Sequence, residues 1–147
     1  MKKVVIMQIL FLWAQFSLAA TTEIWQGSGE LFNIQGNVIG KYSLAIENTI
    51  ISDTKTRRNV TITAADGRVE KIKCMVVKGA KGWSSDCSNG HGGGQCFGEG
   101  LCHSYVKKGN KAYATTIVMD GPNEMRLLRT ELVNGKATHI FREKMQK

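Results

Sequence analysis

Apolar and polar residues alternate along most of the chain, in short runs separated by turn residues. Alternation with a period of two predicts β-strands that have one buried and one solvated face. The clearest case is the run in which Tyr42, Leu44 and Ile46 alternate with polar or small neighbours. The candidate strands lie near residues 23–33, 38–51, 58–64, 68–77, 95–107, 111–119, 124–133 and 136–145.

The segments between these runs carry residues that favour tight turns, because Gly and Asn tolerate the positive φ that hairpin loops need. The turn sequences are Gln35-Gly36-Asn37, Ala65-Asp66-Gly67, Gly109-Asn110, Asp120-Gly121-Pro122-Asn123 and Asn134-Gly135. About eight strands joined in order by such turns predict an all-β, single-domain antiparallel meander. It closes most economically into a small up-and-down barrel, lipocalin-like by analogy, and a two-layer β-sandwich is the alternative.

Matching apolar faces across two turns predicts two hairpin registers. A three-residue loop with Gly67 left-handed pairs Val60 with Ile72. A two-residue turn at 134–135 gives four pairs: Leu132 with Ala137, Thr130 with His139, Leu128 with Phe141 and Arg126 with Glu143. Residues 123–133 also fit a helical stripe, but the strong turn that follows them favours a strand.

The first twenty residues have the three parts of a secretory signal peptide: Lys2 and Lys3, an apolar run over 4–16, and small residues ending at Ala20. The apolar run is too short for a membrane-spanning helix, which needs about 20 residues. An uncleaved anchor is the alternative. We expect residues 1–20 to be removed and residues 21–147 to form one periplasmic or secreted domain.

The cysteines Cys74, Cys87, Cys96 and Cys102 predict two disulfides, because an even count in a small exported chain most often means paired cysteines. Loop entropy does not separate the possible pairings. If 95–106 is one strand, Cys96 and Cys102 lie about 20 Å apart on it, too far to bond. We therefore favour the nested pairing of Cys74 with Cys102 and Cys87 with Cys96.

The segment 79–100 holds half of the 16 glycines, and its centre reads CSNGHGGGQC. This composition predicts a flexible surface loop tied at its base by a disulfide. Its polar residues Asn89, His91 and Gln95 are candidates for contacts with a partner.

Other interpretations of this segment are weaker. A metal site could use Cys87, His91, Cys96 and either Cys102 or His103, but the spacings match no familiar zinc pattern. The sequence HGGG resembles the oxyanion-hole motif of esterases, yet the Gly-x-Ser-x-Gly nucleophile that accompanies it is missing from the chain. The sequence therefore predicts no metal, no cofactor and no catalytic residue.

Composition and charge limit the classes of partner that the protein could bind. A chain that is 42% hydrophobic and 22% charged has the composition of a globular domain. Its formal net charge is +8, and the basic residues fall mostly beside turns, as at Lys55, Arg57 and Arg58, which predicts a solvated basic rim. Export and scattered aromatics argue against nucleic acid. The wet strand face argues against an integral membrane protein. We expect a monomer.

Three functions compete. The first is a non-enzymatic, disulfide-stabilised barrel that binds a small apolar or amphipathic ligand, since an eight-stranded barrel is just wide enough to hold one. Its candidate ligand-binding residues are Trp25, Tyr42, His139 and Phe141. The second is an envelope, interaction or inhibitor protein that uses the 79–100 loop. The third and weakest is a metal-dependent enzyme.

Overall fold

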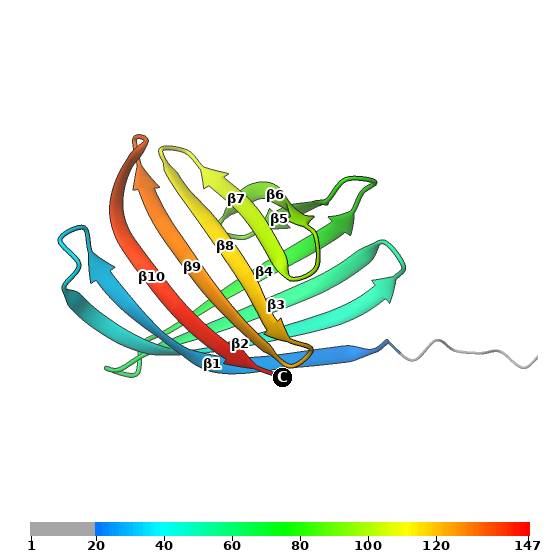
Figure 1. Ribbon diagram of the computed structural model, residues 1–147, viewed down its shortest axis with the longest axis horizontal. Coiled ribbons are helices and arrows are strands. Elements are labelled where there is room, and N and C mark those ends of the chain that lie inside the picture. The colour runs from blue at the N-terminus through cyan, green and yellow to red at the C-terminus, as the bar shows by residue number, and fades with distance from the viewer. Residues whose placement is uncertain (1–19) are drawn as a thin grey trace, which may run out of the picture.

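The computed structural model describes residues 20–147, which form ten antiparallel strands and, within that range, no helix. The strands are β1 (Thr22–Asn33), β2 (Val38–Ser52), β3 (Lys55–Ala64), β4 (Val69–Lys78), β5 (Trp83–Cys87), β6 (Gly90–Phe97), β7 (Leu101–Lys108), β8 (Lys111–Gly121), β9 (Glu124–Val133) and β10 (Lys136–Gln146). Each strand pairs with its neighbours in sequence, and β10 pairs with β1, so the meander closes into a barrel (Figure 1). The predicted signal peptide falls almost entirely outside the described residues.

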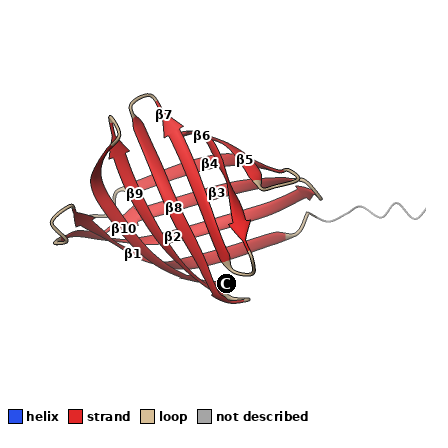
Figure 2. Cartoon of the chain, turned by 45° about the horizontal axis from the view of Figure 1, so that its top comes forward, coloured by secondary structure: helices blue, strands red, loops and turns tan. Residues whose placement is uncertain are grey.

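The all-β barrel predicted from the alternation is confirmed, whereas the alternative β-sandwich is not what forms: a single layer of strands wraps around one interior (Figure 2). The strand count was too low. The segment 79–100 is not a loop, because it contains all of β5 and β6 and supplies part of the barrel wall. The predicted strand 95–107 is instead the end of β6, a turn at 98–100 and β7.

The glycines of β6 are explained by the close approach of the neighbouring strands. A Cβ atom on Gly92 would overlap the carbonyl oxygen of Tyr105, and one on Gly94 would overlap the indole ring of Trp83. Side chains at these positions would therefore collide with β7 and with an aromatic residue of β5. The glycine run is a packing feature of the wall.

One predicted hairpin register is confirmed, and the other is confirmed only next to its turn. The pairing of Val60 with Ile72 is confirmed, and Gly67 has a φ of 84° in the turn. The pairing of Leu132 with Ala137 is also confirmed.

Beyond Ala137, however, the register of the last hairpin shifts by one residue at a bulge. The three other predicted pairs were therefore wrong: His139 lies opposite Glu131, Phe141 opposite Arg129 and Glu143 opposite Leu127. Leu128, predicted to share a face with Phe141, points outward and is 51% exposed. The helical alternative for 123–133 is also wrong, because this segment is β9.

All four cysteines form disulfides, but the nested pairing was wrong. Cys74 bonds to Cys87 across β4 and β5, and Cys96 bonds to Cys102 across β6 and β7. The turn at 98–100 places Cys96 directly opposite Cys102, with their Cα atoms 3.9 Å apart. The assumption that 95–106 is one strand caused the error. Because the sulfur atoms are bonded in pairs, they supply no thiolate ligands for a metal.

A buried apolar cluster lies at the end of the barrel where β10 reaches the C-terminus (Figure 1). Trp25, Leu44, Met125 and Met145 form a buried cluster there, with Ile46 among the partly buried side chains packed against it. This cluster closes one end of the interior. Over the described range 20–147, no helix is long and apolar enough to cross a membrane.

Candidate ligand-binding site

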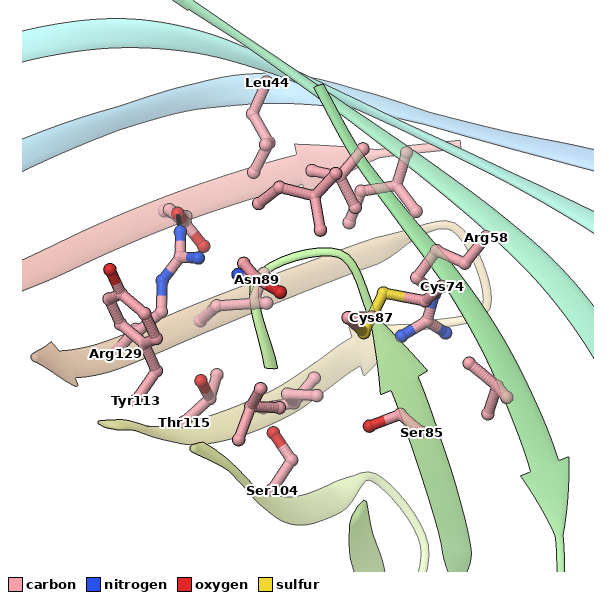
Figure 3. A pocket seen from close by; sticks show the side chains of 18 of the residues that line it. Leu44, Arg58, Cys74, Ser85, Cys87, Asn89, Ser104, Tyr113, Thr115 and Arg129 are labelled. Atoms are coloured by element: carbon pink, nitrogen blue, oxygen red, sulfur yellow. Dashed lines mark hydrogen bonds and ion pairs between the residues drawn. A yellow bond between two sulfur atoms is a disulfide. The ribbon is translucent and has the colours of Figure 1, made fainter. Parts of the chain in front are cut away.

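The middle of the barrel encloses a cavity of about 140 Å³ (Figure 3). Most of its wall is apolar, from residues of β2, β3, β4, β7, β8 and β9: Leu44, Ile46, Val60, Ile72, Val76, Val106, Ile117 and Leu127. The polar part of the wall comprises Ser85, Asn89, Ser104, Tyr113 and Thr115, together with three charged residues, Arg58, Arg129 and Glu143. The cavity therefore combines an apolar wall with a few fixed polar groups, the usual composition of a small-molecule site.

A second space of about 270 Å³ continues the cavity toward the mouth formed by the β1–β2 and β3–β4 turns. The two spaces share four lining residues, Ile72, Asn89, Tyr113 and Arg129. The mouth is also lined by Leu31, Ile39, Tyr42 and Phe141, which do not line the first cavity. The interior is therefore accessible from the end opposite the buried cluster.

A buried ion pair stands between the two spaces. Glu143, which is 2% exposed, accepts a hydrogen bond of 2.6 Å from the Tyr42 hydroxyl and another from the Arg129 guanidinium. Burial, and next the charge of Glu143, raises the pKa of Tyr42 well above its ordinary value, so this hydroxyl stays a donor. Burial alone would lower the pKa of Arg129, but the charges of Glu143 and Tyr42 and the hydrogen bonds to them together outweigh it, and the net shift is upward.

Gly29 of β1 leaves space for the ring of Tyr42, whose hydroxyl donates to this ion pair. A Cβ atom on Gly29 would overlap the ring of Tyr42. The ring therefore lies directly over the β1 backbone, which brings its hydroxyl to Glu143 on the neighbouring strand. The missing side chain at Gly29 thus leaves room for an aromatic side chain.

Glu131 organises a second polar cluster toward the mouth. Its carboxylate, 10% exposed, accepts hydrogen bonds from Thr138 at 2.8 Å and pairs with His139 Nδ1 at 2.7 Å and Lys111 Nζ at 3.0 Å. Burial alone would raise the pKa of Glu131, but these three partners outweigh it and lower the pKa to about 2. The Tyr113 hydroxyl donates to the same carboxylate at 3.3 Å.

Arg58 lies on the wall of the cavity opposite Arg129 (Figure 3). It was predicted to belong to a solvated basic rim, which was wrong, because its strand position points it into the barrel beside Asn48 and Cys74. Its Nε donates to Asn48 Oδ1 at 2.8 Å. Among residues 20–147 no carboxylate lies within ion-pair distance of it. Its neighbour Arg57 is exposed.

The four residues predicted to bind a ligand are divided by the structure. Tyr42 and Phe141 line the mouth, with their rings 6.3 Å apart. His139 is half-buried near them and is held by Glu131. Trp25 lies at the other end, in the buried cluster. A ligand contact by any of these residues stays a prediction.

The three predicted loop-contact residues do not form one surface. Asn89, in the β5–β6 turn, lines both the cavity and the mouth. His91 and Gln95 are on the outside of β6 and exposed, and His91 pairs with Asp86 at 2.7 Å. Asn89 is separated from them because it lies in the turn before β6, outside the alternation that directs His91 and Gln95 outward.

Sequence reasoning missed the charged residues of the interior. Arg58 has the same strand parity as Val60 and Ile62, which is the signal that would have revealed its direction. Arg129 was hidden by the bulge after Ala137, which places the other face of β9 beside Phe141 and Glu143. Glu143 has the same strand parity as Phe141, which is the signal for its inward direction.

Comparison with known proteins places the fold and nothing finer. No family model and no curated protein matches the chain. Among solved structures, the S-type phycobiliprotein lyase CPES from Guillardia theta superposes with a TM-score of 0.67 at 10% identity, over 84% of this chain and 86% of that one. The protein has the barrel fold of that structure.

Two further barrels superpose less closely. A de novo designed fluorescence-activating β-barrel gives a TM-score of 0.43 at 10% identity, over 83% of this chain and 90% of that one. EF1p2_mFAP2b bound to DFHBI gives 0.46 at 15% identity, over 84% and 90%.

Proposed function

We propose that the protein is an exported, non-enzymatic carrier that binds one small apolar or amphipathic ligand inside its barrel. The cavity carries this proposal: an apolar wall surrounds a few oriented polar groups, and the space continues to an accessible mouth. Binding in the interior of an antiparallel barrel also agrees with the dimensions of the fold.

The state of the interior polar groups favours binding over catalysis. Tyr42 and Arg129 are both engaged by Glu143, and His139 and Lys111 are both engaged by Glu131. A general acid or base must reach its substrate with a free proton or lone pair. Groups held in mutual pairs are better suited to fix a pocket's shape.

Two features support export. Both disulfides join adjacent strands, and such bonds persist in oxidising compartments such as the periplasm or the extracellular space. The N-terminal sequence has the order of a signal peptide. The alternative of an interaction module depended on a free loop at residues 79–100, but this segment forms part of the barrel wall.

The test is binding of the neutral fluorescent probe N-phenyl-1-naphthylamine to the purified, oxidised protein. We expect saturable binding with a stoichiometry of one. Ser85→Phe places a ring in the cavity and should abolish this binding, whereas Ser84→Phe, on the exposed outer face of the same strand, should leave it intact.

Equal binding by both variants, or no saturable binding by the parent protein, would contradict an interior site. Circular dichroism of each variant controls for loss of the fold. Native mass spectrometry of protein purified from its own compartment then identifies the natural ligand, as extra mass that disappears on denaturation.

A further inference from the structure

The interior contains more positive charge than its carboxylates neutralise at close range. Glu143 is held by Arg129 and Tyr42, and Glu131 is held by Lys111 and His139. Arg58 is the cation of the cavity wall that this arrangement leaves without a close carboxylate partner. Its only hydrogen bond from the guanidinium to another described residue is to the neutral amide of Asn48.

An arginine in this position is costly unless something binds it. A half-buried guanidinium has lost part of its hydration, and Arg cannot escape by deprotonation because it stays charged under all ordinary conditions. Burial lowers the pKa of Arg58, which records the same cost. With Nε on Asn48, the two terminal nitrogens remain as donors facing the cavity (Figure 3).

The surroundings specify what can bind there. Two parallel N–H groups of a guanidinium match the oxygen atoms of a carboxylate or a sulfonate. The hydroxyl of Ser85 lies on the same side of the cavity and can add a donor. The rest of the nearby wall is apolar, with Val60, Ile72 and Val76 closest in strand order.

We propose that Arg58 is the anchor for the acidic group of an amphipathic anion, whose apolar body lies along the cavity wall toward the mouth. This inference rests on the proposed function and narrows it to ligands that carry one carboxylate or a similar oxyanion. The Arg129–Glu143 pair is then part of the wall, neutral as a unit, while Arg58 sets the charge that the ligand must bring.

The test uses two probes with the same aromatic body: 8-anilinonaphthalene-1-sulfonate, which is anionic, and N-phenyl-1-naphthylamine, which is neutral. The parent protein should bind the anionic probe more tightly. Arg58→Met should weaken the anionic probe by about ten- to hundredfold, the loss expected for a charge-assisted hydrogen-bonded pair, and leave the neutral probe within about twofold.

Arg57→Met is the matched control, because it removes the same charge from the adjacent, outward-facing position. It should change neither affinity by more than about twofold. Thermal unfolding gives an independent readout: without ligand, Arg58→Met should be at least as stable as the parent, since an uncompensated cation has been removed. A large loss of stability would instead assign Arg58 a structural role and overturn the proposal.

The remaining outcomes are distinguishable. If both probes bind the parent inside the barrel and Arg58→Met weakens neither, the anion site is refuted and the carrier proposal stands. If Arg57→Met weakens the anionic probe as much as Arg58→Met, the effect is general surface charge and the anion site is again refuted. If neither probe binds the parent, both proposals fail.

Discussion

Removing one member of the buried ion pair between Arg129 and Glu143 should be more harmful than removing both. Glu143 is 2% exposed, so Arg129→Met leaves a carboxylate in the interior with only the Tyr42 hydroxyl as a donor. Breaking a buried pair from one side costs about 3–5 kcal/mol, whereas replacing both members with apolar residues is often neutral. Since small domains are stable by only about 5–15 kcal/mol, the single variant loses a large part of the total.

The assay is urea unfolding of the oxidised protein at pH 7, followed by tryptophan fluorescence, for the parent, Arg129→Met, Glu143→Leu and the double variant. The double variant should be more stable than Arg129→Met alone.

Arg126→Met provides the control for this experiment. Arg126 lies on the same strand and pairs with Asp120 through two hydrogen bonds of 2.6 Å, but on the exposed outer face. Solvent screens such a pair, so its loss should leave stability close to that of the parent. If Arg129→Met were as mild as Arg126→Met, or if the two interior substitutions added in the double variant, the argument from burial would be refuted.

Two further predictions concern the mouth and the first strand. The pKa of Glu131 is lowered to about 2, so its ionised form stabilises the folded state at any pH above the ordinary pKa of a glutamate. This contribution to the free energy of unfolding is at most about 3 kcal/mol, and it is lost as the pH falls from about 5 through 2. Urea midpoints at pH 7 and pH 3 should therefore differ less for Glu131→Gln than for the parent, and an equal difference would refute the assignment. Gly29→Ala should lose about 1–3 kcal/mol, because its methyl group would overlap the ring of Tyr42. Gly40→Ala, whose methyl group would meet Leu31 at an ordinary 3.6 Å, should stay near the parent in the same urea titration, and equal losses would contradict the packing argument.

Much of the fold could be predicted because most strands have one wet and one dry face. The alternation around Tyr42, Leu44 and Ile46 identified β2 and its inward residues directly, and the turn at Gly67 fixed the β3–β4 register. Strands β5 and β6 could not be found this way. In β6 the neighbouring backbones approach so closely that glycine replaces the apolar residues on which the pattern depends, and β5 is short and mostly polar.

The disulfide pairing failed for the same reason. Once β6 was missed, the turn at 98–100 was missed too, and Cys96 and Cys102 were placed on one strand instead of opposite each other. Each disulfide joins two adjacent antiparallel strands, so its pairing can be predicted once the hairpin is located correctly. The wrong pairing therefore came from a missed turn and not from the chemistry of the cysteines.

The candidate site was harder to predict than the fold, because its informative residues break the rule that finds strands. Arg58, Arg129 and Glu143 are charged residues at inward positions, where the alternation predicts apolar ones. Burying a charged residue costs stability, and the ion pair between Arg129 and Glu143 offsets this cost for two of the three residues. Within residues 20–147, Arg58 alone of the three is left without a close counter-charge, and the anionic ligand that we propose would supply it.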